Sequence, residues 1–418
     1  MTARRLAPLT LGFLLAVAAC SSSSSNSSGS AATTAPAATT GAAATTAAAT
    51  TAAPTTAPPT TAAPTTEPPT TVAPKSPAHV FVVMLENTSY DTTFGAGSKA
   101  PYLATDLTAK GALLTQFFGI AHVSQGNYIA QISGQAPNPS TQSDCGTYTE
   151  FVPTGVGGDG QVLGDGCVYP ADVKTIADQL TTAGLTWKAY GEDMAASATE
   201  PKTCRHPAIG AKDETLGARK GDQYATRHMP FVYFHSIIDT PACDAQVVDL
   251  TALDADLASA DTTANLTYVV PNLCNDGHDH GCVDGEPGGL ESANTFLQAW
   301  VPKILASPAF GENGLLVVTF DEADVAGDAS SCCGDLPSPN LGDKQAGISG
   351  PGGGRVGAVV IGSAVEPGTV VDTAYNHYSL LCSLENLWGL DKLGYAGNPA
   401  TPCFGADVFS ADPSFAQG

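Results

Sequence analysis

The sequence predicts an α/β fold with a mostly parallel central sheet and helices on both faces. Short apolar segments alternate with segments of helical character from residue 79 to residue 387, and this alternation is typical of parallel sheets covered by helices. Two of the apolar segments, residues 79–85 and 315–320, contain almost no polar residue. They are therefore expected to be strands that are buried on both faces of the sheet.

In the first part of the domain, residues 79–85 and 113–118 are mostly apolar and are predicted to be strands. Residues 102–110 and 127–132 are predicted to be helices, the second of which ends at a glycine. Residues 135–170 are rich in Gly, Pro, Asp and Thr. We expect them to form a long surface excursion that could lie over the functional site.

Farther along the chain, glycines end two predicted helices, and a Pro-Asn pair ends one predicted strand. Another helix has an apolar face at helical spacing despite an internal proline. The remaining predicted helices are residues 175–183, 295–305 and 378–387, and the remaining predicted strands are residues 186–190, 231–234, 266–270, 315–320 and 356–361.

The N-terminal residues have the character of a targeting segment followed by a tether. Residues 1–20 combine two arginines with an apolar run and end at Cys20, in a sequence that resembles a lipobox. We expect a lipoprotein signal peptide with Cys20 as the lipidated residue; an ordinary signal peptide is the alternative. Residues 21–75 are rich in Ser, Thr, Ala and Pro and are predicted to be a disordered stalk. Residues 76–418 are then the folded domain, outside the cytoplasm, either anchored to the cell membrane or secreted.

The chain is strongly acidic, with a formal net charge of −23. Such a surface repels nucleic acid and anionic membranes at long range, so nucleic acid is not an expected partner. An anionic substrate would need a local positive centre. A metal ion or a helix N-terminus could supply it.

Ten cysteines follow Cys20, and an even number outside the cytosol favours disulfide bonds. A zinc cluster is the weaker alternative, because the chain contains no CxxC pair. Cys332 and Cys333 are adjacent, and we expect them to pair with different partners.

Two of the predicted buried strands run directly into carboxylates. Glu86 and Asn87 follow the first strand, and Asp321 and Glu322 follow the strand at residues 315–320. Ligands of open α/β sheets bind outside the carboxyl ends of the strands, so these acids could meet around one hard cation. The alternative is that each is a solvated acid at a strand end.

A second polar segment lies just before a predicted helix. Ser124 could place its hydroxyl at the helix N-terminus, where free backbone N–H groups favour an anion. A base or a metal could activate it as a nucleophile. His122 belongs to the same segment, and Asn127 could donate to an oxygen that gains charge. The alternatives are that Ser124 caps the helix and that Asn127 satisfies a turn.

Histidines accompany two further segments. Asp276, His278, Asp279 and His280 form a dense cluster in a loop, and His377 immediately precedes the last predicted helix. These groups could bind a metal or act as general acids, because a histidine can protonate a leaving alkoxide near neutral pH. A solvated polar loop is the alternative. The remaining histidines are expected to be structural: His79, His206, His228 and His235.

Five motifs, in order, resemble those of the bacterial phosphoesterase family, which contains acid phosphatases and phospholipases C and is related to alkaline phosphatases. They span nearly the whole folded part of the chain. The motifs are residues 86–91 with Phe94-Gly95, residues 122–128 leading to Ser133-Gly134, residues 271–279, Asp321-Glu322, and residues 376–381.

The resemblance implies an alkaline-phosphatase-like fold and the hydrolysis of phosphate esters. It also implies a role for each matching position. These roles are a divalent metal bound by Glu86, Asn87, Asp321 and Glu322, a nucleophile at Ser124, substrate contacts from Asn127 and Asp276, and catalytic groups at His122, His278 and His377.

We therefore predict metal-dependent hydrolysis of phosphate monoesters through Ser124, in the manner of an acid phosphatase. Oxygen ligands suggest calcium, magnesium or manganese, and nearby imidazoles allow zinc or iron. The expected partners are a small-molecule or lipid phosphate ester and a membrane, reached through the lipid anchor. The alternatives are a phospholipase C-type phosphodiesterase, transfer to an acceptor other than water, and a lipoprotein that binds a solute or phosphate without catalysis.

Overall fold

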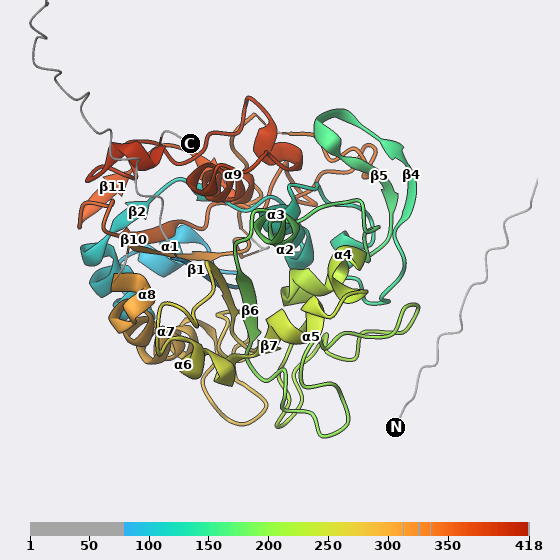
Figure 1. Ribbon diagram of the computed structural model, residues 1–418, viewed down its shortest axis with the longest axis horizontal. Coiled ribbons are helices and arrows are strands. Elements are labelled where there is room, and N and C mark those ends of the chain that lie inside the picture. The colour runs from blue at the N-terminus through green and yellow to red at the C-terminus, as the bar shows by residue number, and fades with distance from the viewer. Residues whose placement is uncertain (1–78, 312, 325–326, 335, 417–418) are drawn as a thin grey trace, which may run out of the picture. The chain divides into compact units, whose positions relative to one another are not determined.

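The computed structural model describes residues 79–416, apart from residues 312, 325, 326 and 335 (Figure 1). The predicted signal peptide, the lipidation site at Cys20 and the predicted stalk lie outside the described residues. Among the described residues, no helix combines the length and the apolar character that crossing a bilayer requires.

The described domain is built on an eight-stranded sheet in the order β11-β2-β10-β9-β1-β8-β6-β7. Neighbouring strands run parallel, except that β10 lies antiparallel to both β2 and β9. The predicted mostly parallel sheet is therefore confirmed. Its strands are β1 (His79–Leu85), β2 (Ala112–Leu114), β6 (Trp187–Gly191), β7 (Val247–Asp249), β8 (Leu266–Val270), β9 (Gly314–Phe320), β10 (Ala358–Gly362) and β11 (Thr369–Val371).

Helices cover both faces of the sheet, as the alternation of elements predicts. Figure 1 shows α2, α3 and α9 on one side and α6, α7 and α8 on the other. The helices are α1 (Tyr90–Phe94), α2 (Ser124–Ser133), α3 (Ile176–Thr182), α4 (His235–Ile238), α5 (Ala242–Gln246), α6 (Leu253–Asp256), α7 (Gly289–Ala306), α8 (Pro308–Gly311) and α9 (His377–Trp388).

Shorter elements complete the domain. The predicted helix at residues 102–110 is divided into a π-helical turn, η1 (Tyr102–Leu107), and a 3-10 turn, η2 (Thr108–Lys110). Two small sheets pair β3 (Phe117–Phe118) with β12 (Tyr375–Asn376) and β4 (Val152–Val156) with β5 (Val162–Asp165). The other 3-10 turns are η3 (Thr141–Ser143), η4 (Gly158–Gly160), η5 (Thr226–His228), η6 (Pro230–Tyr233), η7 (Leu250–Ala252), η8 (Gly394–Gly397) and η9 (Pro413–Ala416).

The predicted strand at residues 231–234 is wrong, because most of this segment belongs to the turn η6. Pro230 opens the turn and cannot donate a hydrogen bond to a strand ladder. The aromatic residues are instead fully buried: Phe231 stacks on Trp187 and meets Tyr268 edge to face. The aromatic residues of this segment reflect its burial in the core. A buried strand would have the same composition, so composition alone does not distinguish the two.

Disulfide bonds join the ten described cysteines, as predicted. The pairs are Cys145–Cys167, Cys204–Cys243, Cys274–Cys282, Cys332–Cys333 and Cys382–Cys403. The expectation that Cys332 and Cys333 bond to different partners is wrong, because they bond to each other.

The strands β1 and β9 position the polar residues that follow them. Both strands are completely buried and pair in parallel, with Leu85 opposite Phe320. The backbone N–H of Asp321 continues this pairing with the carbonyl oxygen of Leu85, at 2.9 Å. Glu86 and Asp321 therefore leave the sheet side by side at its carboxyl edge.

Outside this edge, Glu385 of α9 is a buried acid that should make stability depend on pH. Burial raises its pKa to about 8, from the ordinary value of 4.5. Between these pH values the unfolded chain has lost a proton that the folded chain retains. Unfolding therefore becomes easier as pH rises from about 5 to about 7.5.

We predict that Glu385→Gln removes this dependence, because glutamine does not titrate and can still accept the hydrogen bond from the Leu393 N–H. Relative to the variant, the wild-type free energy of unfolding should fall by up to about 1.4 kcal/mol per pH unit. Urea denaturation at pH 5 and pH 7.5 measures the difference. Parallel pH profiles for the two proteins would contradict the prediction.

Candidate active site

Asn87, in the turn between β1 and α1, makes hydrogen bonds to both Glu86 and Asp321. The backbone N–H of Asn87 donates to Asp321 Oδ1 at 2.9 Å. Its side-chain Nδ2 donates to Glu86 Oε2 at 2.9 Å. The predicted meeting of the two acidic segments, which are more than 200 residues apart in sequence, is therefore found in the structure.

Ser124 lies against the same group of oxygens. Its hydroxyl donates to Glu86 Oε2 at 2.8 Å, and Asn87 Nδ2 lies 3.3 Å from the hydroxyl oxygen. The Tyr128 hydroxyl donates to the other Glu86 oxygen at 2.6 Å. Ser124 and Tyr128 lie one turn apart on α2, so this helix presents both hydroxyls to a single carboxylate.

Ser124 does not cap α2, which was one alternative for it. It is the first residue of the helix, the N-cap position is Val123, and no side chain makes a hydrogen bond from that position. The Ser124 hydroxyl therefore belongs to the acidic group and not to the helix end.

Glu322 and His122 form a second, fully buried pair. His122 Nδ1 contacts a Glu322 oxygen, and its Nε2 lies 2.8 Å from the carbonyl oxygen of Asp328. Because a carbonyl only accepts, Nε2 carries the proton in this contact. Burial lowers the pKa of His122 and raises the pKa of Glu322. With Nε2 protonated, the contact at Nδ1 needs one further proton, which His122 and Glu322 share, and this contact orients Glu322.

His377 contacts the backbone of Asp321. Its Nε2 lies 2.6 Å from the Asp321 carbonyl oxygen, and its Nδ1 lies 3.2 Å from Gln131 Nε2. The Tyr268 hydroxyl in turn donates to Gln131 Oε1 at 2.6 Å. Burial lowers the pKa of His377 to about 4, so the ring is neutral and donates through Nε2. In this geometry His377 positions Asp321, and its side chain is buried away from solvent.

The side chain of Asn127, a predicted site residue, bonds to the backbone before α2 and not to the acids. Its side-chain oxygen accepts from the N–H groups of Ile120 and Ala121, and its Nδ2 donates to the Ala121 carbonyl oxygen. These three bonds use the amide to hold the turn before α2. The contacts therefore match the alternative in which Asn127 satisfies a turn.

The loop after β8 brings Asp276 and His278 toward the group. Asp276 is completely buried, and this burial raises its pKa. Repulsion from the nearby Glu86 carboxylate raises the pKa further. Its Oδ1 accepts from the His278 N–H at 2.9 Å. The His278 side chain is 48% exposed, so it is the predicted site histidine that solvent can reach.

His228 is a site residue that sequence reasoning missed. It is completely buried and stacks on Tyr128, with Nε2 at 3.3 Å from Glu86 Oε1 and Nδ1 at 3.7 Å from Asp276 Oδ2. Neither ring nitrogen makes a hydrogen bond. Burial lowers its pKa. No polar cluster surrounds it in the sequence, so only the tertiary structure reveals its place.

The composition of the site fits a hard cation. Four carboxylates of this site, Glu86, Asp276, Asp321 and Glu322, are at most 1% exposed, and two of their oxygens, Asp276 Oδ2 and Asp321 Oδ2, are buried without a hydrogen-bond partner. Burial is the largest cause that raises the pKa of Asp321. Repulsion from the Glu86 and Glu322 carboxylates raises it further. Buried acids are costly unless a positive charge compensates them. Carboxylate and amide oxygens are suitable donors for a divalent ion.

A pocket of about 330 Å³ opens beside Asn87. Its wall combines hydroxyl groups, the side chain of Leu290, and an ion pair between Lys99 and Glu291. A larger hollow of about 610 Å³, between α3 and α4, includes none of the predicted site residues. The smaller pocket includes Asn87 in its wall and so adjoins the acidic group.

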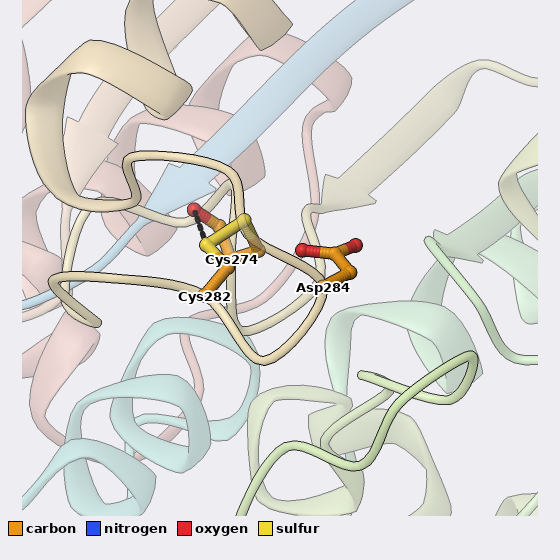
Figure 2. Close-up of side chains that lie close together, drawn as sticks. All are labelled: Cys274, Cys282 and Asp284. Atoms are coloured by element: carbon orange, nitrogen blue, oxygen red, sulfur yellow. Dashed lines mark hydrogen bonds between the residues drawn. A yellow bond between two sulfur atoms is a disulfide. The ribbon is translucent and has the colours of Figure 1, made fainter.

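A separate group of potential metal ligands, Cys274, Cys282 and Asp284, is shown in Figure 2. The two sulfur atoms form a disulfide bond, so neither is available as a thiolate ligand. This group therefore fits a structural disulfide and not a metal site.

Residues 96–391 match the model of the phosphoesterase family. The chain is 27% identical over 315 residues to a phosphate-repressible acid phosphatase of Penicillium chrysogenum, covering 75% of this chain and 59% of that protein. It is 27% identical over 330 residues to a phosphatidylinositol-3-phosphatase of Mycobacterium tuberculosis, covering 78% and 83%. A solved structure in the alkaline phosphatase superfamily from Vibrio parahaemolyticus aligns with a TM-score of 0.46 at 15% identity, over 80% of this chain and 72% of that one.

We predict that the acidic group binds a divalent metal ion and that binding stabilises the fold. Protein stripped with a chelator should gain about 2.7 kcal/mol in free energy of unfolding when the free ion reaches a hundred times its Kd. The double variant Glu86→Gln/Asp321→Asn should lose this gain. Thermal unfolding with each candidate ion measures it.

Asp256→Asn is a matched control, because Asp256 pairs with Lys188 away from the site. It should keep the response to metal. An equal response in the wild type and the double variant would place the ion elsewhere.

Proposed function

Because the chain belongs to the phosphoesterase family, we propose that it hydrolyses phosphate monoesters with Ser124 as the nucleophile. The observation that carries this proposal is the contact of the buried Ser124 hydroxyl with Glu86, at 2.8 Å, inside a cluster of acids. A serine is a weak nucleophile until a base or an ion activates it, and the cluster provides a carboxylate acceptor for its proton.

The proposed metal site consists of Glu86, Asn87, Asp321 and Glu322. A divalent ion bound there would supply positive charge for the phosphate oxygens and would favour the ionised form of a nearby hydroxyl. The oxygen donors suit calcium, magnesium or manganese, and the adjacent imidazoles keep zinc and iron as candidates.

The residues of this chain supply the remaining steps. Ser124 Oγ attacks phosphorus as its proton moves toward Glu86; a P–O bond forms to serine, and the ester P–O bond breaks. His278, whose side chain is exposed to solvent, donates a proton to the leaving alcohol. Water then attacks the phosphoserine and releases inorganic phosphate and the free hydroxyl. His122 and His377 hold Glu322 and Asp321 in place.

The pocket beside Asn87 supports a compact alcohol as the leaving group, because its volume is only about 330 Å³. A lipid phosphate monoester is the second candidate, favoured by the similarity to the mycobacterial phosphatidylinositol-3-phosphatase, 83% of which is covered. Its acyl chains would lie outside the pocket. Lipid anchoring at Cys20 and a location outside the cytoplasm are part of this proposal and would bring the domain to such a surface.

We predict that Ser124→Ala lowers kcat on an aryl phosphate by at least about a thousandfold, because the bond-forming oxygen is removed. Release of the phenol measures turnover. Ser133→Ala is the matched control: Ser133 lies on the same helix but bonds to the carbonyl oxygen of Ile129. It should turn over like the wild type. Retained activity in Ser124→Ala would reject the nucleophile.

We also predict that phosphate monoesters are turned over in preference to diesters, with inorganic phosphate as the product. A panel of aryl phosphate, phosphatidylinositol phosphate and phosphatidylcholine separates the candidates. Release of phosphocholine would favour a phosphodiesterase, and phosphoglycerol formed in added glycerol would favour transfer. Stoichiometric phosphate binding without turnover would favour a binding protein.

A further inference from the structure

The loop that follows α2 returns to both ends of the nucleophile segment. Gln142 Nε2 donates to the carbonyl oxygen of His122 at 3.0 Å, two residues before Ser124. Asp144 Oδ1 accepts from the backbone N–H of Gln125 at 3.1 Å, one residue after Ser124. The loop therefore holds the chain two residues before and one residue after the proposed nucleophile.

The Asp144 contact replaces a missing helix cap. The first N–H groups of a helix have no partner within the helix and are normally bonded by the N-cap side chain. Val123 occupies the N-cap of α2 and cannot supply one. Asp144 thus bonds one of the free N–H groups from nineteen residues away in sequence.

A remote cap has a consequence for Ser124. Serine side chains near helix starts readily bond to free backbone N–H groups of the first turn. Asp144 takes one of these groups, the Gln125 N–H, and so holds the backbone next to Ser124, whose hydroxyl bonds to Glu86. The backbone next to the proposed nucleophile is thus held by a residue from outside the acidic group.

Several features fix Asp144 in this place. Asp144 and Cys145 both have left-handed backbone conformations, with φ of 50° and 48°. Such conformations are uncommon in residues other than glycine and persist when their surroundings hold them. Cys145 is bonded to Cys167, which anchors the far end of the excursion.

Arg227 faces Asp144 from the opposite side. Its Nε lies 3.4 Å from Asp144 Oδ2, and its side chain is only 8% exposed. Nη1 of Arg227 lies 3.2 Å from the carbonyl oxygen of Leu216, which anchors the guanidinium. One Asp144 oxygen is thus directed to the helix and the other to the arginine.

We propose that Asp144 is a positioning residue for catalysis: it caps α2 from outside so that the Ser124 hydroxyl is directed to Glu86, and the Cys145–Cys167 bond holds it there. This proposal rests on the proposed function. It adds a residue that lies outside the five motifs and contacts neither the proposed metal ligands nor the Ser124 hydroxyl.

The test compares Asp144→Ala with Asp144→Asn on an aryl phosphate. Alanine removes the acceptor, so kcat should fall about ten- to a hundredfold, while KM changes less than about threefold, because the nucleophile is misdirected but the binding groups remain. Asparagine keeps an acceptor oxygen of the same reach and should recover most of kcat. Exchange of the Gln125 amide hydrogen should be faster in the alanine variant and near wild type in the asparagine variant.

Circular dichroism and melting curves check that both variants are folded. A folded Asp144→Ala that keeps wild-type kcat overturns the proposal. Equal loss in the two variants also overturns it, because the charge facing Arg227, and not the cap, would then matter. Wild type and Ser124→Ala are measured alongside. Absence of Ser124-dependent turnover rejects the proposed function itself, which separates that failure from a failure at Asp144.

The disulfide provides a second arm. Cys145→Ser/Cys167→Ser should reproduce the fall in kcat at nearly constant KM. Cys204→Ser/Cys243→Ser is the matched control, because that bond joins segments outside the excursion, and it should leave kcat within twofold of wild type. Equal kcat in the two double variants would overturn the role of the Cys145–Cys167 bond. If the Cys145–Cys167 variant does not fold, the two Asp144 variants decide.

Discussion

The site depends on the parallel pairing of β1 with β9. This pairing places Leu85 opposite Phe320, and the two strands are buried along their whole length. The next residue of each strand is therefore delivered to one point at the carboxyl edge of the sheet, still inside the protein. A slip of one residue in this register would direct these side chains to opposite faces. The fold itself thus imposes the proximity of Glu86 and Asp321.

Acids held together in this way repel one another, and the surrounding residues offset part of the cost. Glu86 receives hydrogen bonds from three donors, Ser124, Asn87 and Tyr128. Asp321 Oδ1 accepts from the Asn87 backbone N–H, while Oδ2 has no hydrogen-bond partner. The hydrogen bonds therefore satisfy one carboxylate and leave its neighbour incomplete. A cation would complete the set, which is why stability and ion binding should be linked in this protein.

Sequence patterns predicted those parts of the site that depend on local order. The strands β1 and β9 are recognisable because a nearly continuous apolar run predicts a buried strand. The acids that follow each run must then lie at the carboxyl end of that strand. Contacts between segments that are distant in the sequence leave no such pattern in it, so they could not be predicted. His228 lies in an aromatic segment whose burial could be predicted but whose neighbours could not. The amide of Asn127 was equally able to bind a substrate or a turn, and only the position of residues 120–121 decides between them.

The excursion at residues 135–170 illustrates the same division. Its composition predicts a long surface segment, and the hairpin of β4 and β5 does lie in it, with exposed valines. Yet the part of it nearest to α2 reaches the carbonyl of His122 and the N–H of Gln125, and a disulfide bond joins the residue that follows this part, Cys145, to Cys167. The free N–H groups at the start of α2 need partners, because the N-cap residue Val123 supplies none, and Asp144 bonds one of them. Loop composition gives no sign of that need. It arises from the geometry of the helix start, and the excursion is the segment close enough to meet it.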